Sequence, residues 1–290
     1  MDLSTSLNVL WEPPRISAEE AVERVAAAGF QALDMNFCDW LFDGSPFVGE
    51  AWESWVRGIR RRADAVGIRF GQAHGPIFNK FAEGERTRWL TAMSHRSLVA
   101  AGILGAPRVV FEPGTLGGGF DAAHLARTKQ RNLDWFGALL PDAAQSGVGL
   151  ALENNADLSS RERGTRRSFC STPAELVDLV DTFATPRVGI CWDTGHAHLQ
   201  RLDQGPAIRA LGQRLKVLHI QDNNGDSDQH LLPFNGTVDW RAVMGALRNI
   251  GYPGTLSFEV HASIRLLPDG LRDAALHYAV AVGRYLTGLE

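Results

Sequence analysis

The sequence predicts an α/β fold, a (β/α)8 TIM barrel that forms a single domain over residues 1–290. Two observations lead to this prediction. Segments with helical spacing alternate with eight short apolar segments, most of which directly follow a Gly or a turn. The apolar segments are also continuous rather than alternating, which is typical of parallel strands buried on both faces. A doubly wound open sheet fits the sequence less well, because Trp11-Glu12-Pro13-Pro14 stands after the first strand, where such folds have a Gly-rich nucleotide-binding turn.

The expected strands follow one another along the chain. They cover residues 4–10, 32–35, 68–70, 108–111, 148–152, 188–192, 215–220 and 254–260. Helix signals lie between them: Ser17 with Glu20, and Thr172 with Glu175, form capping boxes that mark helix starts. Another helix shows an apolar face at helical spacing, made by Trp52, Trp55, Val56, Ile59, Ala63 and Val66. These aromatic residues are expected to fill the core.

The composition excludes several function classes. Lys and Arg number 29 against 33 Asp and Glu, and the net charge of −4 offers no overall attraction for nucleic acid or an anionic membrane. The longest apolar run, residues 98–107, is about half of the ~20 residues that span a bilayer. The N-terminus lacks the basic and apolar regions of a cleaved signal, and Cys38, Cys170 and Cys191 are too scattered for a disulfide framework. A cytoplasmic protein with free thiols and no membrane segment is expected.

Ionisable residues gather where the expected strands end. The parallel strands of a barrel present their C-terminal ends at one face, and active sites are built there. Six of the eight strands end on or beside an ionisable side chain, whereas their opposite ends show no such cluster. In chain order these side chains are His74, Glu112, Glu153, Asp193 with His196, His219 with Asp222, and Glu259. The sequence therefore predicts a functional site at this face.

The charge of these residues indicates a metal. Glu153 and Glu259 each follow a short apolar strand segment, so both carboxylates lie on backbone that belongs in the interior. Unpaired buried carboxylates are costly and repel one another, and no Arg or Lys stands at these strand ends. A single Glu there is more often a helix cap or an ion-pair partner. Four ligands from four neighbouring strands instead favour a divalent cation held by Glu153, Asp193, His219 and Glu259.

Three of the strand ends resemble a known superfamily. Residues 148–154, 189–196 and 217–222 are similar to the strand motifs of the xylose isomerase-like TIM-barrel superfamily. That group includes sugar phosphate isomerases and epimerases, ketose 3-epimerases, dehydratases of inosose and dehydroshikimate, and nucleases of the endonuclease IV type. The resemblance extends over strands two to eight, and it is more specific for the metal site than for the substrate.

The resemblance implies roles for individual residues. In the epimerase-like members, the residues that match Glu153, Asp193, His219 and Glu259 hold one divalent metal, for which Mn, Zn, Co and Mg are the candidates here. In those members the two glutamates, which match Glu153 and Glu259, also act as acid and base. The implied activity is that of a metal-dependent sugar or sugar phosphate isomerase or epimerase, which removes a proton next to a carbonyl. The implied partner is a small-molecule carbohydrate, and nucleic acid is not expected.

The nuclease-like members use a larger ligand set with three zinc ions. Eight residues match that set, namely His74, Glu153, Asp193, His196, His219, Asp228, His230 and Glu259. Glu112 stands where the nuclease pattern has histidine, and Phe234-Asn235-Gly236 stands where a Pro-Gly pair is usual, so the match is incomplete. His74, Glu112, His196, Asp228 and His230 therefore remain candidates either for a second metal or for substrate binding.

Other residues are weaker candidates. Arg161 and Arg166 lie in the long loop after strand five, where they either are solvated or close over an anionic group. His198 and His261 are expected to face away from the site, and His95, His124 and His277 are expected on helix surfaces. Trp11, Phe47 and Trp192 are candidate stacking surfaces for a sugar, with core packing the preferred role of Trp192.

Three alternative functions remain open from the sequence. The first is a zinc phosphodiesterase acting on abasic DNA, against which the negative charge and Glu112 count. The second is a dehydratase of a cyclic polyol or keto acid, which begins with the same proton abstraction. The third is a metal-binding barrel without catalysis, which the intact pair of glutamates disfavours. The apolar residues of the 42–48 loop make a homo-oligomer a further expectation.

Overall fold

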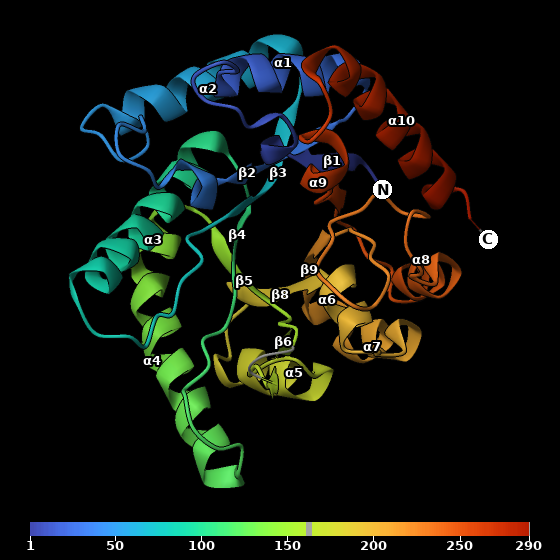
Figure 1. The fold of residues 1–290 in the computed structure, drawn as a ribbon. Helices are drawn as coiled ribbons and strands as arrows, with labels where there is room; N and C mark the ends of the chain where they lie inside the picture. The colour runs from blue at the N-terminus through green and yellow to red at the C-terminus, as the bar shows by residue number, and fades with distance from the viewer. Residues whose placement is uncertain (161–163, 290) are drawn as a thin grey trace.

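Eight parallel strands form a nearly closed barrel with helices around it, which confirms the predicted fold class (Figure 1). The structure is a computed structural model that describes residues 1–160 and 164–289. The strand order is β10-β1-β2-β3-β4-β5-β8-β9. The strands are β1 Leu3–Ser6, β2 Ala32–Asn36, β3 Arg69–His74, β4 Arg108–Phe111, β5 Gly149–Glu153, β8 Val188–Asp193, β9 Leu215–His219 and β10 Leu256–Phe258.

The barrel closes where the two ends of this order meet. Ile220, just after β9, pairs with Phe258 of β10 in a parallel bridge. The Ile220 amide donates to the Ser257 carbonyl at 2.7 Å, and the Glu259 amide donates to the Ile220 carbonyl at 3.0 Å. Because β10 also pairs with β1, the first and last strands of the chain lie side by side.

The helices begin and end much as the capping signals predict. The Ser17 hydroxyl accepts from the Glu20 amide at the start of α1, and the Thr172 hydroxyl accepts from the Glu175 amide at the start of α5. The α-helices are α1 Ala18–Ala28, α2 Trp52–Val66, α3 Glu85–Leu104, α4 Ala122–Gln145, α5 Pro173–Thr182, α6 Thr194–Leu199, α7 Gln204–Leu211, α8 Trp240–Asn249, α9 His261–Ile264 and α10 Asp269–Thr287. None of the helices within residues 1–160 and 164–289 has the length and hydropathy needed to cross a bilayer.

Two expected strands differ from the structure. The first, predicted over residues 4–10, ends at Ser6, and Leu7–Leu10 instead forms a short 3-10 helix. All four residues of that helix are buried, so an apolar run of this length does not distinguish a strand from a helical turn. The last, predicted over residues 254–260, is shorter and covers Leu256–Phe258. The loop after β5 also contains an antiparallel hairpin that was not expected, formed by β6 Leu158–Ser160 and β7 Gly164–Arg166.

The interior of the barrel has an apolar half and a polar half. On four neighbouring strands, a small cluster separate from the main core consists of Val110, Ala151, Cys191 and Val217. The other strands bring buried polar side chains inside, namely Ser4, Ser6, Asp34, Gln72 and Ser257. The Ser257 hydroxyl donates to the Ser4 hydroxyl at 3.2 Å, which links β10 to β1. Gln72 likewise donates to Asp34 at 2.9 Å, which links β3 to β2, as buried polar groups bond one another.

The cysteines and outer histidines mostly follow expectation. Cys38, Cys170 and Cys191 are free thiols. His277 is exposed and His95 is half-buried beside Asp142. The expectation for His124 was wrong: it is buried, because its ring turns back over the loop before α4 and lies 3.2 Å from the Leu116 carbonyl.

Candidate metal centre

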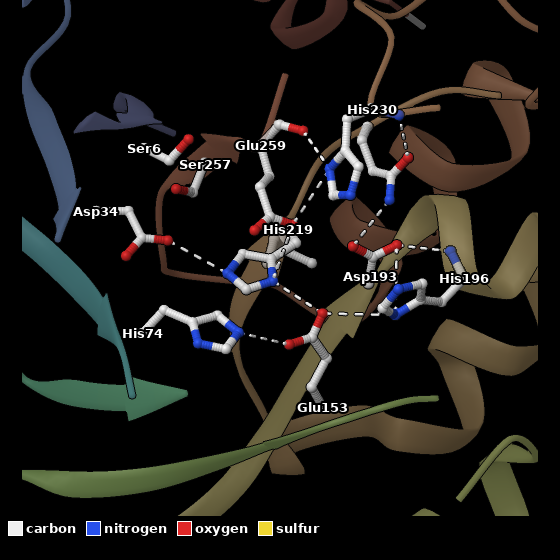
Figure 2. Close-up of polar contacts among 12 residues, drawn as sticks. Ser6, Asp34, His74, Glu153, Asp193, His196, His219, His230, Ser257 and Glu259 are labelled. Atoms are coloured by element: carbon white, nitrogen blue, oxygen red, sulfur yellow. Dashed lines mark hydrogen bonds and ion pairs between the residues drawn. The ribbon is translucent and has the colours of Figure 1, made fainter. Parts of the chain in front are cut away.

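Four side chains converge at the C-terminal ends of the strands (Figure 2). Glu153 ends β5, Asp193 ends β8, His219 ends β9, and Glu259 directly follows β10. Each offers one ligand atom, and these atoms all lie within 4.8 Å of one another. Atoms of His74, at the end of β3, form a second such group with Glu153 and His219.

Strand alternation explains why three of these side chains point inward. Side chains two residues apart on a strand share a face. Glu153, Asp193 and His219 each lie two residues beyond a member of the apolar cluster inside the barrel, namely Ala151, Cys191 and Val217. The same alternation that buries the small apolar residues therefore carries the three polar side chains to the mouth of the barrel.

His219 is central to the group. Its Nδ1 atom lies 2.9 Å from Oε1 of Glu153 and 3.5 Å from Oε2 of Glu259. Its Nε2 atom lies 3.2 Å from Oδ2 of Asp34, which is fully buried and also accepts from Gln72 at 2.9 Å. The imidazole thus presents one nitrogen to the two glutamates and the other to Asp34.

Asp34 is not among the site residues predicted from the sequence. It lies inside β2 rather than at its end, so a search of strand ends passes over it. The signal that identifies it is a charged residue flanked by Leu33 and Met35, both fully buried, within a short strand. Such an acid needs a partner in the interior, and in this barrel the partner is His219.

Asp193 has two distinct oxygen environments. Its Oδ1 accepts from the His196 amide at 2.6 Å, which caps the start of α6. Its backbone exchanges two hydrogen bonds with the Asn154 side chain, at 2.7 and 3.0 Å. Its Oδ2 has a long contact of 3.4 Å with Nε2 of Gln221. One oxygen therefore fixes the helix, and the other remains available to a ligand.

The four residues fit a divalent cation. Oε2 of Glu153 is buried and accepts no hydrogen bond from the described residues, although Nε2 of His74 lies 3.3 Å away. Within residues 1–160 and 164–289, all ion pairs of Glu153, Asp193 and Glu259 are with histidines, none with Arg or Lys. Three carboxylates and one imidazole are donors that suit Mn, Zn, Co and Mg.

The two glutamates differ in proton affinity. Burial raises the pKa of Glu153, but His219, His74 and His196 outweigh burial and hold this pKa well below its usual value. Burial also raises the pKa of Glu259, and the opposing histidines leave it at about 7. Both pKa values are those of the site without a cation. A bound cation would lower the pKa of every carboxyl group that it contacts.

The neighbouring histidines respond in the opposite direction. Burial lowers the pKa of His219 and of His74, but nearby acids and thiols raise each pKa well above its usual value. Cys191, Glu153 and Glu259 act on His219, and Cys38 and Glu153 act on His74. In the absence of a cation, protons on these imidazoles would balance the carboxylates, so protons and a metal compete for the same group.

A second group of side chains lies beside the first. Nε2 of His196 is 3.5 Å and Nε2 of His230 is 3.0 Å from Oδ2 of Asp228. The Nδ1 atom of His196 lies 2.9 Å from the Asn154 carbonyl oxygen. The Nδ1 atom of His230 lies 3.0 Å from the Glu259 carbonyl oxygen. A proton on each Nδ1 leaves each Nε2 lone pair directed at Asp228. This arrangement suits either a cation or a substrate hydroxyl.

Several candidate residues do not join either group. Glu112 is half-buried, and its carbonyl rather than its carboxylate has a close partner, Nζ of Lys80 at 2.6 Å. Arg161 and the side chain of Arg166 lie outside the described residues. His198 contacts the Thr237 hydroxyl at 2.7 Å and lines a surface pocket away from the metal group, as expected.

His261 and Phe47 differ from the sequence-based expectation. The His261 ring does not face away from the site but packs on His230, with ring centroids 4.2 Å apart. Burial and the neighbouring His230 lower the pKa of His261 to about 3. Phe47 is fully buried and stacks on Phe37, which excludes a sugar-stacking role.

The two tryptophans also have distinct places. Trp192 is fully buried, as expected, and its Nε1 donates to Gln204 at 3.2 Å. Trp11 is half-buried, and its indole Nε1 finds no acceptor among the described residues. Of the three aromatic residues expected near a sugar, only Trp11 keeps an accessible ring.

A family model matches most of the chain. The family model described as a xylose isomerase-like TIM barrel matches residues 22–278. The chain belongs to this family. The matched residues run from α1 into α10 and include Glu153, Asp193, His219 and Glu259.

Curated relatives in the family have several activities. A "Probable endonuclease 4" of Methanoculleus marisnigri is 31% identical over 87% of this chain and 86% of its own length. A "D-psicose 3-epimerase" of Enterocloster bolteae is 34% identical over 31% of this chain. The match spans only 28% of the epimerase's own length. The uncharacterized protein y4fM of Sinorhizobium fredii is 38% identical over a segment that spans 26% of its own length.

Solved structures match the whole chain. A "D-tagatose 3-epimerase-like protein" has a TM-score of 0.75 at 20% identity and covers 99% of this chain and 98% of its own. A D-psicose 3-epimerase determined with D-fructose has the same TM-score of 0.75 at 19% identity, covering 99% of this chain and 100% of its own. At such identities the match shows the common fold.

Proposed function

We propose that this protein is a metal-dependent sugar or sugar phosphate epimerase or isomerase that uses Glu153 and Glu259 as its acid-base pair. One observation carries the proposal: both carboxylates lie close to Nδ1 of His219, at 2.9 and 3.5 Å, and both belong to the group that includes Asp193. The relatives named as 3-epimerases of psicose, ribulose and other ketoses support a ketose or its phosphate as the substrate.

Glu153 and Glu259 would divide the proton transfer between them. One carboxylate removes the proton next to the carbonyl, and the other carboxyl group returns a proton. Return on the opposite face of the same carbon inverts that centre, whereas return at the neighbouring carbon exchanges aldose and ketose. Such acid-base catalysis contributes roughly 100- to 10,000-fold to a rate.

Glu153, Asp193, His219 and Glu259 would hold the divalent cation. When bound, the cation stabilises the negative charge that develops on the carbonyl oxygen. Asp34 orients His219 through Nε2. His196, Asp228 and His230 would bind a substrate hydroxyl or a second cation, and Trp11 would cover the apolar face of the sugar.

A zinc phosphodiesterase is the second candidate function. The endonuclease 4 relative, whose match spans most of both chains, favours it, as does the group of His196, Asp228 and His230. The net charge of −4 and the absence of Glu112 from the metal groups of the described residues count against it. A dehydratase remains consistent with the same proton abstraction.

One screen separates these activities. The protein, purified without a histidine tag and supplied with Mn²⁺, is incubated with ketoses, aldoses and their phosphates in D2O, and exchange at carbon is followed by NMR. We expect one deuterium to enter next to the carbonyl, with a new epimer or isomer. Loss of water instead indicates a dehydratase. Cleavage of an abasic-site oligonucleotide, with no exchange into any sugar, contradicts the proposal.

A further inference from the structure

Positive charge gathers at the floor of the barrel, the end opposite the candidate metal centre. Arg108 begins β4, Arg187 directly precedes β8, and Lys216 is the second residue of β9. We call these three residues the basic floor. The turns that lead into β4, β5, β8 and β9, residues 105–107, 146–148, 184–187 and 212–214, contain no Asp or Glu. Because the active sites of such barrels lie at the other face, catalysis does not explain this cluster.

Two glycines make room for the cations. Gly149 and Gly189 each lie two residues before a member of the apolar cluster inside the barrel, so strand alternation turns them toward the interior. A Cβ atom at Gly149 would lie 2.2 Å from Nη1 of Arg108, and one at Gly189 would lie 2.3 Å from Cγ of Lys216. The side chains of Arg108 and Lys216 therefore occupy the space that larger residues at the two glycines would fill, beneath the apolar cluster.

Neutral carbonyls hold the two guanidinium groups of the basic floor. Nη1 of Arg108 donates to the Arg187 carbonyl at 2.7 Å, and its Nη2 donates to the Pro186 carbonyl at 3.0 Å. Nη1 of Arg187 donates to the Val148 carbonyl at 3.4 Å. These hydrogen bonds fix the positions of the two arginines, but a carbonyl has no net charge with which to balance theirs.

The three cations repel one another. Burial lowers the pKa of Arg108, and the neighbouring Arg187 lowers that pKa further. Burial and Arg108 likewise lower the pKa of Lys216, whose ammonium has no hydrogen bond or ion pair within residues 1–160 and 164–289. No described carboxylate opposes either shift. Like charges held together without a counterion destabilise a fold, and a bound anion would remove that cost.

A pocket of about 410 Å³ lies next to Lys216, between the turns that lead into β8 and β9. Its lining includes Thr185 and the ion pair of Asp181 with Arg214. The Asp181 carboxylate accepts two hydrogen bonds from Arg214, at 2.5 and 2.8 Å, so it is already engaged and does not balance Lys216. A tetrahedral oxyanion fits a pocket of this size, and guanidinium and ammonium groups are the usual ligands of phosphate in proteins.

We propose that the basic floor binds a phosphate group, supplied either by free phosphate or by a small phosphate ester. Lys216 and Arg187 contact the phosphate oxygens, and Arg108 adds its charge from beneath the apolar cluster. The proposal is independent of the proposed enzymatic function, because the site lies at the opposite end of the barrel. With three cations that remain partly open to solvent, the Kd should be on the order of 1 mM.

Equilibrium dialysis against radiolabelled inorganic phosphate, at constant ionic strength, tests the site. The wild-type protein should bind one phosphate per chain, and Lys216→Met and Arg187→Met should each raise the Kd at least about 10-fold. Lys129→Met is the matched control, because the Lys129 ammonium pairs with Asp178 at 2.8 Å on the outside of the barrel, and it should bind phosphate like the wild type. Unchanged binding by Lys216→Met overturns the proposal.

Two further comparisons locate the phosphate and identify its source. A cation in the metal centre would also attract phosphate, so Glu153→Gln, which alters only that centre, should keep the wild-type affinity for phosphate. Loss of binding in Glu153→Gln with full binding in Lys216→Met would place the phosphate at the metal centre and overturn the proposal. Dialysis with glycerol phosphate as competitor distinguishes the sources: tighter binding of the ester indicates a phosphorylated metabolite, and tighter binding of phosphate indicates the free ion.

Thermal unfolding gives a second measurement of the same site. An anion that binds only the folded chain stabilises it, so about 20 mM phosphate should raise the Tm of the wild type by about 3 °C relative to chloride at equal ionic strength. Lys216→Met keeps the aliphatic stem beside Gly189 but lacks the charge, so phosphate should raise its Tm by less than about 1 °C. Circular dichroism at low temperature checks that the variant is folded. An equal rise in the two proteins overturns the proposal.

Discussion

Oδ2 of Asp34 lies 3.2 Å from Nε2 of His219, although 185 residues of chain separate the two. The contact decides which nitrogen of the imidazole faces the glutamates. A carboxylate behind a ligating histidine fixes its tautomer and ring orientation and increases its basicity. Gln72 holds Asp34 in turn, through its amide at 2.9 Å. The candidate ligand is therefore oriented by strands on the far side of the barrel.

Replacing Asp34 should weaken the metal site without emptying it. Asp34→Asn keeps the size of the side chain but removes the charge behind His219, so we expect the metal affinity to fall about 10- to 100-fold. Competition with a chelating dye measures this affinity. Asp39→Asn is the control, because Asp39 is a neighbouring acid with no contact to His219 among the described residues. Equal losses in the two variants would contradict a specific role of Asp34.

Removing a ligand should remove the metal. Glu153→Gln and Asp193→Asn each replace a charged oxygen by a neutral amide, so the purified proteins should lack stoichiometric metal, and exchange of substrate protons should fall at least about 100-fold. Elemental analysis of untagged protein gives the metal content. Glu112→Gln should retain the metal, since Glu112 does not join the four ligands. Full metal content in Glu153→Gln would exclude the proposed ligand set.

Metal counting separates the two roles proposed for the group of His196, Asp228 and His230, a second cation site or a substrate hydroxyl site. The Nε2 atoms of both histidines lie within 3.5 Å of Oδ2 of Asp228, and both Nδ1 atoms are held by carbonyls. If the group binds a cation, zinc-saturated protein should contain two ions per chain and Asp228→Asn should contain one. Should the wild type bind a single ion while Asp228→Asn raises KM, the group binds substrate instead.

Gly195 should be required for the position of Gln221. A Cβ atom at Gly195 would lie 2.2 Å from Cδ of Gln221, whose amide donates to Asp228 at 2.6 Å. Gly195→Ala should therefore displace Gln221 and lower activity at least about 10-fold, as a small misplacement in an active site does, with folding retained. Gly137→Ala, on α4 with open space around it, is the matched control. It should stabilise the fold by about 0.5–1 kcal/mol, measured by urea unfolding, and leave activity unchanged.

Lys80 should make stability depend on alkaline pH. Its ammonium is buried among Phe78, Trp135 and Phe136, and burial lowers its pKa from 10.5 to about 8. Between these two values the unfolded chain binds a proton that the folded chain does not, so the free energy of unfolding rises with pH in this window. The full gain is on the order of 3 kcal/mol.

Urea unfolding of the wild type and of Lys80→Met at several pH values measures this effect. The difference in unfolding free energy, wild type minus variant, should increase as the pH rises from about 8 toward 10, because the variant lacks the titrating amine. If the difference in unfolding free energy stays constant or decreases over that range, the pKa of Lys80 is not lowered by burial.

The sequence predicts much of the barrel and most of the metal group for one physical reason. Buried strands appear as continuous apolar runs, and a charge directly after such a run, as at Glu153 or Asp193, is conspicuous. Asp34 is not visible in this way, because it interrupts a strand instead of ending it. The roles of these residues remain predictions until metal and activity are measured.

Other features depend on tertiary geometry that a sequence pattern does not carry. Leu7–Leu10 is as apolar as a strand but turns as a 3-10 helix, since burial alone does not select a backbone conformation. His261 was expected to face away on the basis of strand alternation. The chain leaves β10 at Phe258 and enters α9 at His261, so alternation no longer applies there, and the ring meets His230.

Closure of the barrel through β1 and β10 has a consequence for how the protein matures. Glu259 stands beside the seam where β1 and β10 join, so the candidate ligand set is incomplete until β10 has entered the sheet. A chain truncated before residue 256 would have three of the four candidate ligands and an open edge at β1. Assembly of the four side chains should accordingly depend on the closure of the barrel rather than on the pairing of its other strands.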